Sequence, residues 1–265
     1  LTGTGALVIN DSNNSGTVIF TGNNSYTGGT TIQNGSLVLK DGDRLNADGA
    51  VTVNQGASFD LKDAGNQSIG ALAGGGNVKL GTNTLTLNQN TNTTFSGVIS
   101  DTPASANKGP KEPEPQEPST AGSIVKNGSG TLTVTGANTY TGSTQINAGG
   151  IVLEGTLDSQ LINIEEDAFL TIVNSGLSST AVLNNYGTIN LQSSDVVGTF
   201  NNVGVLNTNG YTLTASVYEL TDGSVVNGYL GAGTINANGY VQLNSSNEAN
   251  AVNVQSGTTV LGDEG

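Results

Sequence analysis

Hydrophobic and polar residues alternate along most of this chain in short runs. Residues 84–87 read Thr-Leu-Thr-Leu and residues 131–134 read Thr-Leu-Thr-Val, so every second side chain is apolar. A period of two is that of a β-strand with one buried face, and Asn-Gly, Gly-Gly and Asp-Gly pairs separate the runs as turns would. We find no convincing stretch with a helical period, so the pattern predicts strands and turns with almost no helix. Similar runs occupy residues 6–9, 17–20, 36–39, 50–53, 77–80, 161–164, 188–191 and 240–243.

The chain also repeats itself at long range. Residues 22–39 return as residues 136–153. A repeated apolar strand between Asn, Gly and Thr turns is typical of stacked units that each bury an inner face against the next. The identical pairs are Gly22/Gly136, Asn24/Asn138, Tyr26/Tyr140, Thr27/Thr141, Gly28/Gly142, Thr30/Thr144, Ile32/Ile146, Gly35/Gly149, Val38/Val152 and Leu39/Leu153.

Short strands with many turns favour an all-β parallel β-helix of roughly 12 rungs, each of about 20 residues. Residues 184–190 and 201–207 are two candidate rungs, because both begin with Asn-Asn and end with Asn. We expect their asparagines to stack as an amide ladder parallel to the axis. We expect the Gly74-Gly75-Gly76 run to form a tight corner of a rung. A β-sandwich is the structural alternative.

One segment breaks the pattern. Residues 103–120 contain all five prolines of the chain, and we expect an extended loop there because proline removes ladder donors. This divides the chain into β-helix rungs over 1–102, a Pro- and Glu-rich loop over 103–120, and further rungs of the same solenoid over 121–265. The loop is either a tolerated decoration or a recognition or proteolytic segment. Its charged candidates for partner binding are Lys111, Glu112, Glu114 and Glu117.

Composition and charge restrict the partners. Only 34% of residues are hydrophobic and 11% are charged, which indicates an ordered β structure with a narrow core. The net charge is −14, and residues 127–265 contain no Lys or Arg. Nucleic acid and anionic lipid surfaces are therefore not expected partners. The acidity either keeps an exposed surface soluble or forms a face for cations or a basic partner, with Glu165, Glu166 and Asp167 as the densest acidic run.

Residues 138–155, NTYTGSTQINAGGIVLEG, preceded by SIVKNGSGTLTVTGA, resemble the passenger-associated transport repeat of type V autotransporters. One copy covers residues 18–39 and a second covers residues 124–153. Residues 69–99 resemble the segment that commonly precedes such a repeat. A degenerate third copy would end the chain, with Val254, Gly257, Val260 and Leu261 in place of Ile32, Gly35, Val38 and Leu39.

The resemblance implies a right-handed parallel β-helix that is exported through the outer membrane and displayed at the bacterial surface. Many members of the family are adhesins, some of them self-associating, and others carry Pro-rich loops like pertactin. The start LTGTGALVIN lacks the features of a signal peptide, and no segment resembles the family's β-barrel. We therefore expect a fragment of a longer passenger whose anchor is not included here.

Candidate chemistry is sparse. The chain has no His and no Cys, which excludes Ser-His-Asp and Cys-His catalysis and the usual zinc ligands. The best calcium candidate is the weak cluster of Asp41, Asp43 and Asp48, which lacks the spacing of an EF-hand loop. Paired carboxylates for glycoside hydrolysis would have to come from Asp41/Asp43 or Asp60/Asp63. We expect neither an enzyme nor a cofactor.

The sequence thus predicts a bacterial surface adhesin fragment that acts through many weak polar contacts along a rigid rod. Self-association between passengers on neighbouring cells is the first hypothesis. A module that binds a host protein or glycan, with the 103–120 loop taking part, and a passive stalk for a distal domain are the alternatives. We expect Tyr26 and Tyr140 to pack within rungs with their hydroxyls reaching solvent or backbone.

Overall fold

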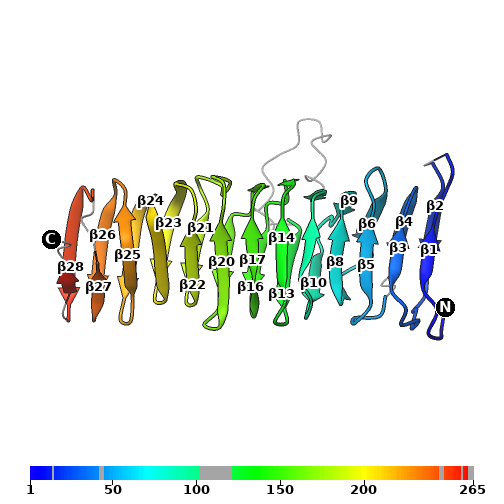
Figure 1. The fold of residues 1–265 in the computed structure, drawn as a ribbon, viewed down its shortest axis with the longest axis horizontal. Helices are drawn as coiled ribbons and strands as arrows, with labels where there is room; N and C mark the ends of the chain where they lie inside the picture. Colours follow the sequence, from blue (N-terminus) through cyan, green and yellow to red (C-terminus); the bar gives the residue numbers. More distant parts are fainter. Residues whose placement is uncertain (14, 42–44, 102–120, 245–247, 258, 262–265) are drawn as a thin grey trace, which may run out of the picture.

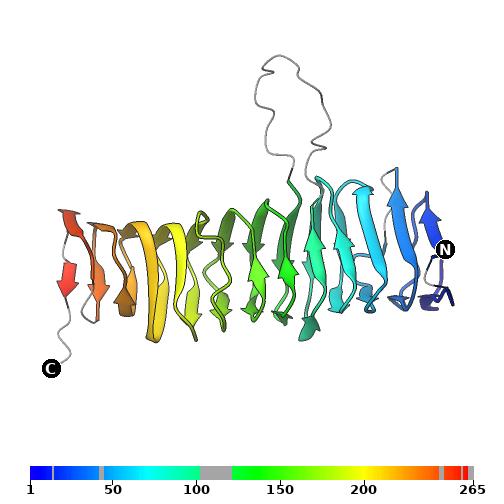
Figure 2. The ribbon, with the colours of Figure 1, turned by 90° about the horizontal axis from the view of Figure 1, so that it is seen from above.

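The structure is a computed structural model that describes residues 1–13, 15–41, 45–101, 121–244, 248–257 and 259–261. Figures 1 and 2 show a single elongated rod of stacked coils with the two termini at opposite ends. Its described residues contain strands and turns but no helix, and the coils make about 12 turns of a β-solenoid. The sequence-based prediction of an all-β parallel β-helix is therefore confirmed.

Each turn of the chain adds strands to three columns that run along the rod. The first column contains β1 (Leu7–Ile9), β3 (Thr30–Ile32), β5 (Ala50–Val53), β8 (Ala71–Gly74), β11 (Thr93–Phe95), β14 (Thr131–Val134), β17 (Gly149–Leu153), β20 (Ala168–Ile172), β22 (Thr188–Leu191), β27 (Val241–Leu243) and β29 (Thr259–Leu261). The second contains β7 (Gln67–Ile69), β10 (Thr84–Asn88), β13 (Ser123–Asn127), β16 (Ser143–Ile146), β19 (Leu161–Ile164), β21 (Val182–Asn185), β26 (Thr234–Asn238) and β28 (Ala251–Ser256). The third contains β2 (Thr17–Phe20), β4 (Ser36–Lys40), β6 (Ser58–Asp63), β9 (Asn77–Lys79), β12 (Val98–Ser100), β15 (Ala137–Asn138) and β18 (Thr156–Leu157). Three longer strands bend from one column into the next, namely β23 (Asp195–Asn202), β24 (Val205–Thr221) and β25 (Val225–Leu230).

The alternating pattern explains the core. In β10, Leu85 and Leu87 point inward and are fully buried, whereas Thr84 and Thr86 are half-exposed on the outer face. The buried apolar side chains of successive rungs form one continuous cluster along the axis. The ladder continues across the 102–120 segment, because β10 pairs directly with β13 and β11 with β14. Residues on either side of that segment therefore belong to adjacent rungs.

The rungs vary in length along the rod. In the first half, Thr30 pairs with Val51 and its column continues from Val51 to Leu72, a step of 21 residues each time. In the second half the step varies, because the hydrogen bond from Asn201 to Asn184 joins residues 17 positions apart and the bond from Asn184 to Asn163 joins residues 21 positions apart. The predicted rung of about 20 residues thus lies within an observed range of 17 to 21 residues for these steps.

A column of glycines forms the turn between the first and third columns of strands. A Cβ atom on Gly97 would clash with the carbonyl oxygen of Gly76, one on Gly136 with that of Gly97, and one on Gly155 with that of Gly136. Consecutive rungs therefore approach each other here more closely than any other residue type allows. This confirms the predicted tight corner at residues 74–76, where Gly74 has a φ of 105°.

Candidate adhesive surface

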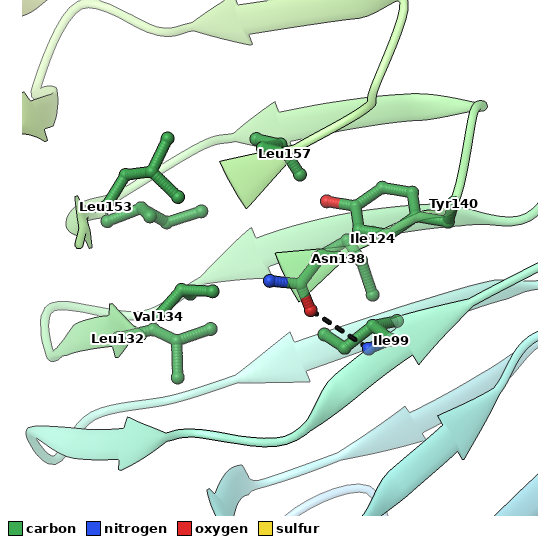
Figure 3. Close-up of a pocket in the computed structure, with 9 residues that line it drawn as sticks. Ile99, Ile124, Leu132, Val134, Asn138, Tyr140, Leu153 and Leu157 are labelled. Atoms are coloured by element: carbon green, nitrogen blue, oxygen red, sulfur yellow. Dashed lines mark hydrogen bonds between the residues drawn. The ribbon is translucent and has the colours of Figure 1, made fainter. Parts of the chain in front are cut away.

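Asn138 fixes the start of the second repeat to both neighbouring rungs. The side chain is fully buried, and its Oδ1 accepts a hydrogen bond of 2.9 Å from the backbone N–H of Ile99 in the preceding rung. Its Nδ2 donates to the carbonyl of Gly136 at 3.0 Å and to that of Thr156, in the following rung, at 3.2 Å. Figure 3 shows this amide beside Tyr140 and a small apolar cavity of about 20 Å³ lined by Ile99, Ile124 and Leu132, among others. The Asn138 side chain therefore adds hydrogen bonds to backbone groups of both neighbouring rungs.

The repeated tyrosines pack within the rod as predicted, but the Tyr140 hydroxyl pairs with a side chain and not with solvent or backbone. Tyr140 is buried and its hydroxyl lies 2.7 Å from the Thr144 hydroxyl, and Tyr26 forms the same pair with Thr30. Burial raises the pKa of the Tyr140 hydroxyl above its ordinary range. The expectation was wrong for Tyr140, because its hydroxyl finds a partner in Thr144, four residues further along the same turn.

The two repeats do not lie on equivalent columns. Ile32 of the first copy lies on a column of pairs that continues through Val53, Gly74, Phe95 and Val134 to Leu153. Its counterpart in sequence, however, is Ile146, which lies on a different column. The turns between the copies therefore do not bring the motif back to the same side of the rod.

Lys126 is a cation inside the rod. It occupies an inward-facing position of β13 between Leu87 and Ile146, and its side chain is fully buried. The ammonium donates to the carbonyl oxygens of Asn127, Gly128 and Ala148 at 2.9, 2.9 and 3.1 Å. Burial lowers its pKa to about 8. The sequence carried a signal for this residue, because Lys126 falls in the apolar phase of the alternation that includes Ile124.

We expect the pH dependence of stability to reveal this lysine. Between about pH 8 and its ordinary pKa of 10.5, the unfolded chain binds a proton that folded Lys126 has released. Raising the pH through this window therefore increases the free energy of unfolding, whereas below pH 8 both states are protonated and this contribution is constant. Urea unfolding at pH 7.5 and 9.5 should show the increase in the wild type and a smaller increase or none in Lys126→Met. Equal changes in both proteins would contradict this assignment.

Two ladders of side-chain amides, one of them interrupted by the Glu219 carboxylate, run along the outside of the C-terminal half. The second-column ladder passes over seven consecutive rungs, and hydrogen bonds of 2.6–2.9 Å join all but one of its steps. Its members are Gln145, Asn163, Asn184, Asn201, Glu219, Asn236 and Asn253. The first-column ladder joins Asn190, Asn207, Asn227 and Asn244 at 2.6–2.9 Å. The predicted stacking of residues 184–190 on 201–207 is confirmed, and the ladders extend beyond those two rungs.

An acidic and aromatic edge separates the two ladders. It consists of the turns between the second and first columns, which stack through contacts such as the Val203 N–H to the Asn185 carbonyl at 2.9 Å. The acidic run predicted from sequence lies at the start of this edge, where Glu165, Glu166 and Asp167 are all exposed. The Glu165 carboxylate accepts a hydrogen bond of 2.6 Å from Gln145. The next turns expose Tyr186, Val203 and Tyr240, with 50, 37 and 52% of their surface accessible.

Sequence reasoning missed these tyrosines. The signal that could have found them is their position beside a turn glycine, in Tyr186-Gly187 and Gly239-Tyr240, where the apolar alternation is interrupted. An aromatic residue outside the alternation has no inward-facing place in the strand pattern.

The remaining candidates are not brought together. Lys111, Glu112, Glu114, Glu117 and Asp43 lie outside the described residues. Asp60 and Asp63 lie on β6 opposite different partners, since Asp60 pairs with Lys79 and Asp63 with Lys40. In the part of the chain that the structure describes, no three potential His, Cys, Asp or Glu ligands gather into a metal site. Within those ranges, no helix has the length and apolar composition needed to cross a membrane.

Comparisons with known proteins agree with the repeats. The profile of the passenger-associated transport repeat family matches residues 13–39 and 124–153. The chain is 32% identical over 188 residues to the adhesin BmaC autotransporter of Brucella suis biovar 1 (strain 1330). That alignment covers 66% of this chain but only 5% of the relative, so the chain spans a small part of its length. No solved structure matches the chain significantly. The expected third repeat at residues 254–261 is not among the matched segments and stays a prediction.

Proposed function

Because its repeats and its adhesin relative support a type V autotransporter passenger, we propose that this chain is an adhesive segment that joins neighbouring cells through its outer amide ladders. Display at the cell surface, through an outer-membrane anchor elsewhere in the protein, is part of the proposal. The similarity to an adhesin also favours a passenger without catalytic activity. The observation that carries the proposal is the second-column ladder, in which six side-chain amides and the Glu219 carboxylate follow one another over seven rungs.

A side-chain amide is complementary to another amide. Its NH₂ group has two donors and its oxygen has two acceptor sites. Within the ladder, Asn184 uses one donor toward Asn163 and accepts one hydrogen bond from Asn201. One donor and one acceptor site therefore remain on such a rung, and a second rod with the same ladder can satisfy both.

The ladder geometry also lowers the entropic cost of docking. Amides that are already hydrogen-bonded along the axis lose little rotamer freedom when a partner arrives. Each contact is weak, but rods on two cells present many rungs at once, and the contacts add through effective concentration. This favours contact between surfaces over stable pairing of free molecules.

The negative charge of the segment opposes self-association, so the proposal predicts a dependence on salt concentration. Residues 127–265 contain eleven acidic side chains and no basic one, so two such rods repel each other. The screening length falls from about 30 Å at 0.01 M salt to about 8 Å at 0.15 M. We expect cells that display the segment to settle faster as salt rises over this range, as measured by the optical density of standing cultures.

The settling experiment needs an anchor-only control and ladder variants. Triple replacement of Asn163, Asn184 and Asn201 by Ala should slow settling because it removes the centre of the second-column ladder. The matched variant replaces Asn190, Asn207 and Asn227 in the first-column ladder and identifies the face that docks. Displaying cells that settle no faster than anchor-only cells at any salt concentration would reject the proposal. Attachment to a host protein or glycan stays a prediction, tested by deleting residues 103–120 and measuring binding to matrix proteins.

A further inference from the structure

We propose that the edge between the two ladders binds a basic, extended polypeptide segment rich in Arg or Lys. The binding edge consists of Glu166, Asp167, Tyr186, Val203, Asp222 and Tyr240, and it lies in the C-terminal half of the rod, from yellow-green to orange in Figure 1. This partner is distinct from the second copy proposed above, and its binding requires no contact between cells.

The binding edge is continuous over five turns of the chain. The turn at Tyr186 follows that of the acidic run, because the Tyr186 N–H donates to the Ile164 carbonyl at 2.8 Å. Val203 follows Tyr186, and a Cβ on Gly204 would clash with the Gly187 carbonyl. The last two turns are joined by the Gly223 N–H, which donates to the Tyr240 carbonyl at 3.0 Å. These turns therefore stack in one row along the axis.

The chemistry of this row fits a cationic partner. Glu166, Asp167 and Asp222 are exposed carboxylates, and Tyr186 and Tyr240 are about half exposed. An Arg or Lys side chain gains from a carboxylate by charge-assisted hydrogen bonding and from an aromatic face by cation–π attraction. Aromatic residues are also enriched at protein interfaces. Since residues 127–265 contain no Lys or Arg, the positive charge has to come from the partner.

The length of the row determines how long a peptide must be to lie along it. Five turns are separated by four steps of about 4.8 Å, which gives a row of about 19 Å. An extended peptide of ten residues spans about 33 Å. A short segment of basic chain can therefore contact both tyrosines and the acidic run at once.

The test uses the purified chain and a ten-residue peptide of alternating Arg and Ser, with binding measured by fluorescence anisotropy at low and physiological salt. We expect binding that weakens as salt rises, opposite to the settling of displaying cells. Tyr186→Ala with Tyr240→Ala should weaken it by at least about tenfold, since two cation–π contacts are lost. Glu166→Gln with Asp167→Asn should weaken it to a similar degree.

Matched controls separate this edge from general attraction to an acidic rod. The double variant Tyr211→Ala with Tyr229→Ala removes two tyrosines of comparable exposure, 41 and 42%, that lie away from the binding edge. Tyr211 lies between the first-column and third-column parts of β24, and Tyr229 lies in the third column, where it pairs with Thr212. Glu154→Gln with Asp158→Asn removes the same charge as the acidic pair from exposed positions elsewhere. Both controls should retain binding. No peptide binding, or an equal loss in edge and control variants, would overturn the proposal.

Two further outcomes would replace the basic partner by another one. Equal affinity for a Gln-Ser peptide, or tighter binding of a neutral dextran at the same tyrosines, would show that charge does not select the ligand. Concentration-dependent dimers in sedimentation velocity that Tyr186→Ala with Tyr240→Ala abolishes, without any peptide binding, would assign the edge to a second copy. A failed settling experiment would leave the peptide result unaffected.

Discussion

Gly136→Ala is expected to destabilise the rod by about 3 kcal/mol or more, the range of the most harmful single substitutions. The added Cβ would overlap the carbonyl oxygen of Gly97, which belongs to the backbone of the preceding rung. A backbone carbonyl cannot turn aside as a flexible side chain can, so the two rungs have to separate at this corner. Because each rung is stabilised mainly by its neighbours, separation at one position weakens the whole array. Urea unfolding followed by far-UV circular dichroism measures the loss.

The chain provides a matched control for this substitution. Gly22 is the counterpart of Gly136 in the first repeat, but no atom lies within 4 Å of the place where its Cβ would be. Gly22→Ala should therefore change the free energy of unfolding by no more than about 0.5 kcal/mol. Equal effects at both positions would mean that the glycine acts through chain flexibility and not through the close approach of rungs.

The second large effect is expected for Asn138→Ala. The substitution leaves the N–H of Ile99 and the carbonyls of Gly136 and Thr156 without the partner that Asn138 supplies inside the rod. Each buried polar group that loses its partner costs about 1–3 kcal/mol, so we expect a total loss of about 2–4 kcal/mol after partial relaxation. The same unfolding measurement applies.

Two variants sharpen this prediction. Asn163→Ala removes an amide of the outer ladder, where water can replace the lost hydrogen bonds, and it should cost no more than about 1 kcal/mol. Asn138→Asp keeps an acceptor for Ile99 but presents oxygens to two carbonyls, so it should be at least as destabilising as Asn138→Ala at neutral pH. An Asn138→Asp protein as stable as the wild type would contradict the three-rung role of this amide.

Local features of the fold could be predicted from the sequence because their signal is local. Alternation in residues 84–87 identifies β10 and its inward leucines, since a strand has a fixed period of two. The matching Asn-Asn starts of residues 184–190 and 201–207 predict their ladder, since side chains of adjacent parallel strands in register stack. The glycine run at residues 74–76 predicts a turn, and this signal is likewise local.

Other features could not be predicted, because they depend on the number of residues in each turn of the coil. No single segment of the sequence specifies that number. The alignment of Ile32 with Ile146 is clear in sequence, but the intervening turns place Leu153 on the column of Ile32. The predicted partner of the Tyr140 hydroxyl was wrong, because its actual partner, Thr144, lies in the same turn. The path of that turn is visible only in three dimensions. The exposed edge of Tyr186 and Tyr240 likewise arises from stacking of turns that are far apart in the chain.

The displacement of the two repeats onto different columns gives each copy its own bearing about the long axis of the rod. The loop at the start of the first copy and the loop at the start of the second copy therefore lie on different sides of the rod. The motif is therefore not confined to one side of the rod. A molecule that contacted the motif could approach from more than one direction, and the rod would not have to rotate about its axis.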